Sequence, residues 1–165
     1  MGKGSFGEVV KARHNRTGTV CAIKLLKNLF KDEYASKKIY TECAVLRLLS
    51  SMRNNVFTSK ILDLVVPDFS RGDQFNYIFI VMESSASDLK KVLTSSTQID
   101  FGEHHVLCII YNTLCCLNYL HTANLMHRDI KPANILIEPD CQIRLCDFGL
   151  TRPVPPNLII PKVSE

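Results

Sequence analysis

The sequence contains no tryptophan and no apolar run long enough to cross a membrane. Its longest mostly apolar stretch, residues 106–120, is interrupted by Asn112, Thr113 and Asn118, whereas a membrane-spanning helix needs about 20 apolar residues. The residues that follow Met1 lack the apolar segment of a secretion signal and the pattern of a lipid attachment site. We therefore expect no membrane partner for this chain.

Closely spaced cysteine pairs are also missing. Seven cysteines are spread over 165 residues, and no two of them have the C-x-x-C spacing that suits zinc or a redox couple. The number is odd, and the fraction is below that of disulfide-stabilised secreted domains. We expect reduced thiols that pack as small apolar side chains.

Length and composition predict about one globular domain, with 46% apolar and 22% charged residues. The net charge of +4 is uneven, because residues 1–60 carry twelve Lys and Arg against four Asp and Glu. These basic residues are scattered and lack interleaved aromatic residues, so no nucleic-acid partner is expected. The lysines that flank the helical pattern of residues 32–49 are expected on a solvated surface: Lys27, Lys31, Lys37 and Lys38.

The first half of the chain has the pattern of a hairpin followed by a helix. Alternating residues 8–13 and 19–25 predict two antiparallel strands. Residues 32–49 predict a helix with Ala35, Ile39, Val45, Leu46 and Leu49 on one face. Glu42 lies in the middle of that apolar face, where a buried carboxylate requires a cationic partner.

In the second half, residues 77–82 predict a strand, and the serine-rich residues 84–87 predict a connection that acts as a hinge. Apolar residues at helical spacing predict a long helix ending near His121, with a core-facing stripe: Val106, Ile109, Ile110, Thr113, Leu114, Leu117 and Leu120. Residues 135–137 and 143–146 predict a second hairpin. Four prolines in residues 153–165 predict a tail without regular structure.

A glycine pattern, Gly2-x-Gly4-x-x-Gly7, opens the sequence and leads into a predicted strand. A dinucleotide-binding loop would open a helix, and a Walker loop would need Lys and Ser or Thr in place of Glu8 and Val9. Glycines between two strands would instead let backbone N–H groups approach phosphate oxygens that side chains would otherwise block.

Four motifs together resemble the signature set of the eukaryotic protein kinases. In sequence order they are Gly2-Lys3-Gly4-Ser5-Phe6-Gly7-Glu8-Val9, Cys21-Ala22-Ile23-Lys24, His127-Arg128-Asp129-Ile130-Lys131-Pro132-Ala133-Asn134 and Asp147-Phe148-Gly149. The resemblance implies an α+β, protein-kinase-like fold with a β-rich N-lobe and one regulatory helix in residues 1–82. A hinge would follow at 83–87, and a partial helical C-lobe, ending in the activation segment, would occupy 88–165.

The resemblance also implies the catalytic residues. Lys24 would bind the α- and β-phosphates of ATP, and Glu42 would hold it by an ion pair. Asp129 would accept the proton of the substrate hydroxyl or align that hydroxyl, while Lys131 would stabilise the charge of the transferring phosphoryl group. Asn134 and Asp147 would coordinate Mg²⁺ through hard oxygen ligands. His127 would be structural, and His104 and His105 are expected on a helix surface.

The same resemblance implies the ATP-binding residues. The glycine loop would contribute Gly2, Lys3, Gly4, Ser5, Phe6 and Gly7. The adenine would lie between Val9, Ala22 and Leu136, with Met82 as gatekeeper. Glu83 and Ser85 would offer backbone groups to the base, and Asp88 would lie near the ribose.

Lys131, two residues after Asp129, is similar to the catalytic loop of serine/threonine kinases. Residues 146–152 and 87–90 look like the mitogen-activated protein kinase branch, although cyclin-dependent kinases share much of this pattern. The resemblance implies ATP and Mg²⁺ as cofactors, a protein substrate with a Ser or Thr hydroxyl, and an upstream activating kinase. It also implies a cytoplasmic location, with the nucleus as a second candidate compartment.

The sequence departs from the family pattern at both ends. Met1 alone precedes Gly2, and no Ala-Pro-Glu element or Thr-x-Tyr pair follows Asp147-Phe148-Gly149. We expect a truncated domain of low stability in which Leu114 and Leu117 are exposed to water. Two functions therefore remain open: a protein serine/threonine kinase, and a truncated non-catalytic nucleotide-binding or interaction module.

Overall fold

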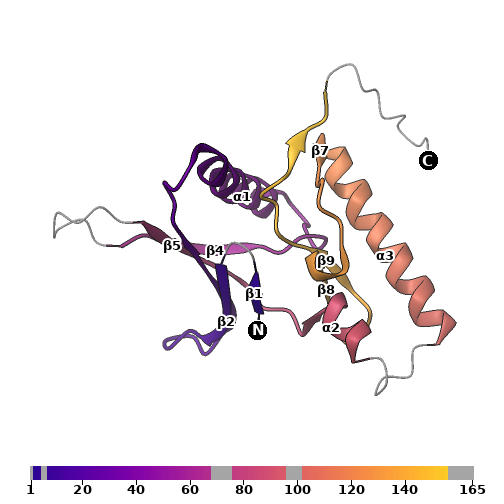
Figure 1. Cartoon of the computed structure of the whole chain (residues 1–165). Coiled ribbons are helices and arrows are strands. Elements are labelled where there is room, and N and C mark those ends of the chain that lie inside the picture. The colour runs from indigo at the N-terminus through magenta and orange to yellow at the C-terminus, as the bar shows by residue number, and fades with distance from the viewer. Residues whose placement is uncertain (1, 5–6, 68–75, 96–101, 156–165) are drawn as a thin grey trace.

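The computed structural model describes residues 2–4, 7–67, 76–95 and 102–155 (Figure 1). Its first part is a five-stranded antiparallel sheet with the strand order β1-β2-β3-β5-β4. The strands are β1 (Gly2–Gly4), β2 (Gly7–Arg13), β3 (Val20–Lys27), β4 (Ile61–Val65) and β5 (Tyr77–Glu83). The hairpin predicted from residues 8–13 and 19–25 is present as β2 and β3.

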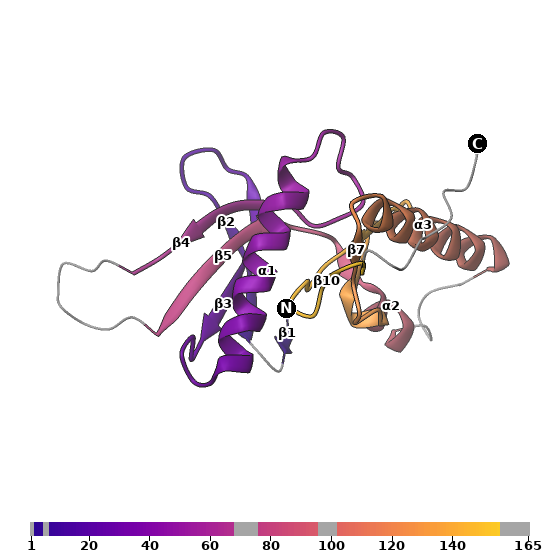
Figure 2. The same ribbon diagram turned by 90° about the horizontal axis from the view of Figure 1, so that it is seen from above.

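Helix α1 (Glu33–Ser51) lies across one face of this sheet (Figure 2). The Asp32 carboxylate caps it by accepting a hydrogen bond from the Ala35 N–H at 2.7 Å. Its buried face joins apolar side chains of β3 and β5 in one core: Leu26, Val45, Leu46, Leu49, Ile78 and Ile80. Burial of this face, rather than helix propensity, accounts for the position of α1.

Lys38 corrects one sequence-based expectation. It was expected on the solvated surface with its neighbouring lysines, but only 7% of Lys38 is exposed, whereas Lys37 is exposed. Lys38 lies four residues before Glu42 and therefore on the same side of α1. The apolar stem of a lysine can be buried in this way against other parts of a protein.

The second part of the chain combines helices with two small sheets. A three-stranded antiparallel sheet has the order β6-β8-β9, with β6 (Ser87–Asp88), β8 (Ile135–Ile137) and β9 (Ile143–Leu145). The helices are α2 (Leu89–Thr94), α3 (Glu103–Thr122) and a short 3₁₀ helix at Pro132–Asn134. The predicted second hairpin is confirmed, while β5 and β6 shorten the predicted hinge connection to residues 84–86.

The apolar stripe of α3 is only partly buried, so Val106 and Ile110 do not face a core as predicted. Leu114 is exposed, as expected, whereas Leu117, also expected to be exposed, is partly buried against the core. Ile109 and Leu120 are buried, but the exposed fractions of Val106, Ile110 and Leu114 are 45%, 52% and 59%. The described residues cover α3 on the side that faces β9 and β7 (Leu125–Met126). The apolar stripe of α3 is wider than the surface that β7 and β9 cover, so the stripe residues outside this surface are exposed to water.

The proline-rich tail also differs from its prediction. Arg152 and Pro153 form β10, which pairs antiparallel with β7, although Pro153 was expected outside regular structure. A two-residue strand at the edge of a two-stranded sheet tolerates the missing N–H of proline. Residues 156–165 of the predicted tail lie outside the described residues.

Backbone hydrogen bonds connect the two parts of the structure. The Ser59 N–H donates to the Leu145 carbonyl at 2.9 Å, and the Leu145 N–H donates to the Phe57 carbonyl at 2.9 Å. The ring of Phe57 also packs against Tyr119 of α3, with centroids 5.1 Å apart. The segment after α1 thereby holds the large sheet against β9 and α3.

All seven cysteines are free; Cys21 and Cys116 are buried, and the other five are half-buried. No helix among the described residues is long and apolar enough to span a membrane.

Candidate active site

Lys24 and Glu42 form an ion pair between β3 and α1. The Lys24 Nζ atom lies 2.5 Å from Glu42 Oε1, and the side chains are 12% and 4% exposed. Strand β3 continues beyond the predicted strand to Lys27, so Lys24 lies within the strand rather than at its end. The cation that the inward-facing Glu42 requires is therefore Lys24.

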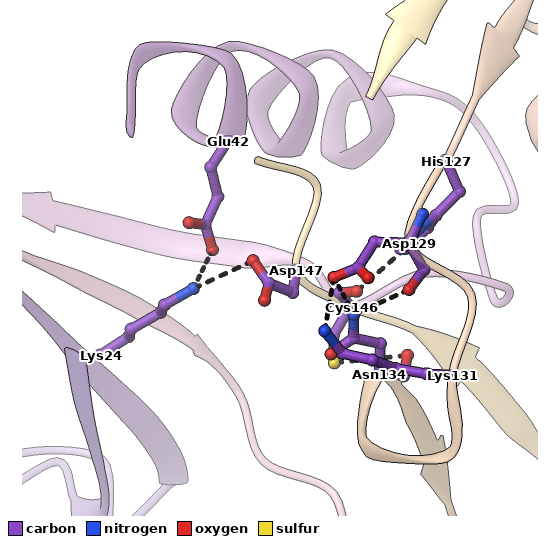
Figure 3. A network of polar contacts seen from close by, with 8 residues as sticks. All are labelled: Lys24, Glu42, His127, Asp129, Lys131, Asn134, Cys146 and Asp147. Carbon is purple, nitrogen blue, oxygen red and sulfur yellow. Dashed lines mark hydrogen bonds and ion pairs between the residues drawn. The ribbon is translucent and has the colours of Figure 1, made fainter. Parts of the chain in front are cut away.

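A second carboxylate approaches the same ammonium from a distant part of the sequence. Asp147 Oδ1 lies 3.5 Å from Lys24 Nζ, although 123 positions separate the two residues (Figure 3). Asp147 has a φ angle of +62°, in the left-handed region that a non-glycine residue seldom adopts. The surrounding contacts hold this strained backbone so that Asp147 faces Lys24.

Burial and the neighbouring charges shift the pKa values of Lys24 and Glu42. At Lys24, burial opposes the charged form, but the Glu42 and Asp147 carboxylates outweigh it and raise the pKa of Lys24. At Glu42, burial raises the pKa of the carboxyl and Asp147 adds to the rise, although Lys24 opposes it. Lys24 is therefore an ammonium group at neutral pH, held between two acidic side chains.

Asp129 lies at the centre of a second polar group, shown on the other side of Asp147 in Figure 3. Its Oδ2 atom accepts hydrogen bonds from Lys131 Nζ at 2.7 Å and from Asn134 Nδ2 at 2.9 Å. Partial burial disfavours ionisation of Asp129, but these hydrogen bonds outweigh it and lower the pKa of the carboxyl. Asp129 is therefore a charged hydrogen-bond acceptor at neutral pH.

His127 supports this loop and is 2% exposed. Its Nδ1 atom accepts a hydrogen bond from the Asp129 N–H at 3.3 Å, which requires a neutral ring that donates from Nε2 to the Cys146 carbonyl at 3.0 Å. The ring also packs against Phe148, with centroids 5.2 Å apart. Burial lowers the pKa of His127, in agreement with a neutral, structural histidine.

Asn134 and Asp147 are brought near each other by the backbone. The Cys146 N–H, next to Asp147 in sequence, donates to the Asn134 carbonyl at 3.1 Å. The Asn134 side chain is anchored through its nitrogen to Asp129, which leaves the amide oxygen for another partner. One carboxylate and one amide oxygen are hard ligands that fit Mg²⁺, which usually takes only one or two protein groups and keeps several waters.

Cys146 lies between these groups but is not a reactive thiol. Burial, reinforced by Asp147, raises the pKa of Cys146 to about 12. Its Sγ atom donates to the Asn134 carbonyl at 3.5 Å. The cysteine therefore acts as a packed, protonated side chain within the site.

The sheet registers pair some of the predicted ATP-binding residues with one another. Ala22 of β3 pairs with Met82 of β5, and Val9 of β2 pairs with Lys24. Leu136 of β8 pairs with Asp88 of β6 in the other part of the structure. The predicted residues thus come from the five-stranded and the three-stranded sheet.

Two predicted groups already have partners in the structure. The Glu83 N–H donates to the Lys60 carbonyl at 3.0 Å, so this N–H is already occupied. The Asp88 carboxylate caps α2 by accepting from the Lys91 N–H at 2.9 Å and pairs with Lys91 Nζ at 2.5 Å. Asp88 would have to share its carboxylate with a ribose.

The glycine loop is described in part. Gly2, Lys3 and Gly4 of β1 pair with β2, with Gly4 opposite Gly7. Ser5 and Phe6, the predicted tip of the loop, lie outside the described residues. The described glycines therefore lie in two paired strands, and Gly7 opens a strand rather than a helix.

Lys38 is a site residue that the sequence analysis missed. A Cβ atom on Gly149 would lie 2.6 Å from Lys38 Cγ, so the lysine stem packs directly against Gly149. The spacing from Glu42, one helical turn, was a signal in the sequence that Lys38 shares the buried side of α1. No sequence signal identified Gly149 as its neighbour.

The chain belongs to the protein kinase family, because the family model described as protein kinase domain matches residues 1–158. Within that family it is similar to mitogen-activated protein kinases, which confirms the predicted branch and the protein-kinase fold.

Three relatives illustrate the similarity, each over 152 residues that cover 92% of this chain. Mitogen-activated protein kinase MPS1 of Pyricularia oryzae is 34% identical, and mitogen-activated protein kinase 13 of Oryza sativa subsp. indica is 39% identical. Serine/threonine kinase NLK of Caenorhabditis elegans is 36% identical. The matched region covers 35%, 28% and 23% of these relatives, so the chain spans about a third or less of their length.

Proposed function

We propose that this chain acts as a protein serine/threonine kinase of the mitogen-activated type, which transfers the γ-phosphate of ATP to a protein hydroxyl. The observation that carries the proposal is the position of Lys24 Nζ, 2.5 Å from Glu42 and 3.5 Å from Asp147. A buried ammonium held by two acidic residues suits the binding of phosphate oxygens. Membership of the protein kinase family supports the same reaction.

In the proposed reaction Lys24 binds the α- and β-phosphates, and Asp129 accepts a hydrogen bond from the substrate hydroxyl. The hydroxyl oxygen forms a bond to the γ-phosphorus, the bond from that phosphorus to the β–γ bridging oxygen breaks, and ADP leaves with the electron pair. The hydroxyl proton passes to the Asp129 carboxylate. Because its pKa is lowered, we expect this transfer late, once the attacking oxygen has become acidic.

The other residues of the site stabilise charge and position the groups. Lys131 places a positive charge beside Asp129, near the transferring phosphoryl group. Asn134 and Asp147 would hold Mg²⁺, which when bound neutralises charge on the phosphate oxygens. Asn134 also orients Asp129 through its amide nitrogen.

We propose the same division of the chain as the sequence suggests: an N-lobe in residues 1–82, a hinge at 83–87 and a partial C-lobe at 88–165. The adenine would contact Val9, Ala22, Met82 and Leu136, with backbone groups of Glu83 and Ser85 at its edge. The proposal includes a protein substrate with a Ser or Thr hydroxyl and an upstream activating kinase. The proposed location is the cytoplasm, with the nucleus as a second candidate compartment.

The test compares phosphate transfer from Mg-ATP to a generic basic protein by the wild type, Asp129→Asn and Asp140→Asn. Loss of the Asp129 carboxylate should lower the rate by about 100-fold or more while leaving stabilisation by Mg-ATP in a thermal melt. Asp140 is exposed and lies in the turn after β8, so its variant should match the wild type.

Transfer that persists in Asp129→Asn would contradict the assigned role. Stabilisation by Mg-ATP without any transfer by the wild type would support the non-catalytic nucleotide-binding module instead. A wild-type chain that melts unchanged with Mg-ATP would contradict both functions.

A further inference from the structure

Glu138 connects the turn after β8 to the connection between β5 and β6. Its Oε2 atom accepts a hydrogen bond from the Ala86 N–H at 3.2 Å, 52 positions away in the sequence. Its Oε1 atom accepts from Arg144 Nη1 of β9 at 2.9 Å. Each oxygen of this carboxylate therefore has its own partner, and one partner is the backbone of residues 84–86.

Arg144 strengthens the same contact from the side. Its Nη1 atom also lies 3.5 Å from the Ser85 hydroxyl oxygen, so the guanidinium approaches the residue before Ala86. The side chains of Arg144 and Glu138 are each 24% exposed, and an ion pair so accessible to water contributes little stability by itself. Its more important effect is to hold the Glu138 carboxylate in one place.

The bond to Ala86 fixes the orientation of a whole peptide group. The Ser85–Ala86 peptide is planar and trans, so the Ser85 carbonyl points in the opposite direction from the Ala86 N–H. Because the N–H points toward Glu138, the carbonyl points away from it. Rotation of this peptide would break the hydrogen bond and would present an N–H where the carbonyl now lies.

We propose that Glu138, held by Arg144, is a positioning residue that keeps the Ser85 backbone oriented for an adenine base. The inference rests on the proposed function, in which Ser85 offers backbone groups to the base. A peptide held in one orientation loses less conformational freedom when a ligand binds, which improves affinity. We call the contacts of Glu138 with Arg144 and the Ala86 N–H the clamp. The clamp orients the peptide that faces the base and is not proposed to contact the phosphates, so its loss should weaken the binding of adenosine and of ATP by the same factor.

The test measures the affinity of the full 165-residue chain for Mg-ATP and for adenosine. Glu138→Ala should weaken both ligands by a similar factor of about three to ten, the effect of one hydrogen bond. Glu138→Gln keeps an oxygen that can accept from Ala86 and should lose less affinity than Glu138→Ala. Asp140→Asn removes a charge from the same turn, and its carboxylate contacts the Gln142 N–H rather than residues 84–86, so wild-type affinity is expected.

Amide hydrogen exchange at Ala86 tests the contact without any nucleotide. Exchange should be faster in Glu138→Ala than in the wild type and close to the wild type in Asp140→Asn, because only the first variant frees the N–H. If Glu138→Ala does not fold, Arg144→Met provides a second variant. Arg144→Met should weaken the binding of ATP and of adenosine by the same factor, and that factor should be smaller than for Glu138→Ala.

Unchanged affinity in variants with faster exchange at Ala86 would overturn the positioning role. A loss confined to ATP, with adenosine unaffected, would also overturn it, because the effect would then concern the phosphates. A wild-type chain that binds neither ligand would overturn the proposed function, and this use of the clamp with it, even if the Ala86 amide were protected by Glu138.

Discussion

The buried stem of Lys38 occupies the space that a side chain on Gly149 would need. A Cβ atom at Gly149 would lie 2.6 Å from Lys38 Cγ and 2.7 Å from Lys38 Cε. Lys38 precedes Glu42 by one turn of α1, and Gly149 follows Asp147 by two residues. The contact therefore joins the two segments that supply the acidic partners of Lys24.

Gly149→Ala should destabilise the protein by about 1–3 kcal/mol, because the new methyl group overlaps a buried side chain. Lys38→Ala removes the overlapping atoms, so Gly149→Ala should cost less in that background. Urea unfolding of the four members of this double-mutant cycle measures the difference. Equal costs of Gly149→Ala in the two backgrounds would contradict the predicted overlap.

Acidification should destabilise the protein through His127. Burial lowers the folded-state pKa of His127, so its contribution is present above the unfolded-state value of about 6.5 and is lost as the pH falls toward the folded-state value. The loss can reach about 1.4 kcal/mol per pH unit. The raised pKa of Glu42 acts in the opposite direction, because protonation of this buried carboxyl on acidification favours the folded state, so the wild type must be compared with a variant.

His127→Asn does not titrate, and its amide oxygen can still accept the hydrogen bond from the Asp129 N–H. Between pH 7 and pH 5 its free energy of unfolding should fall less than that of the wild type, as measured by urea unfolding at several pH values. His104→Asn removes an exposed histidine and serves as the control, with the wild-type dependence expected. A His127→Asn profile parallel to the wild type would show that His127 does not link folding to protons.

Asp147→Asn should remove most of the Mg²⁺ dependence of ATP binding. A ligand that binds only the folded state raises the unfolding temperature according to its affinity, so thermal melts with ATP, with and without Mg²⁺, report this dependence. The wild type and the control Asp140→Asn should gain stability from ATP mainly when Mg²⁺ is present. A full Mg²⁺ effect in Asp147→Asn would contradict a metal-binding role.

The sequence predicted those parts of the structure that depend on local patterns. The hairpin of β2 and β3, the helix α1 with Glu42 on its apolar face, and the hairpin of β8 and β9 all follow from residue periodicity. The four motifs carried the resemblance to protein kinases, and the match to residues 1–158 confirms it.

Tertiary structure decided which side chains meet and which faces are covered. Lys38 is buried because Gly149 leaves room for its stem, and Glu138 reaches Ala86 across 52 positions of sequence. The stripe of α3 is half exposed because the described residues cover only one of its sides. Periodicity shows which residues share a face, but the packing of distant segments determines what that face contacts, and this packing depends on the whole chain.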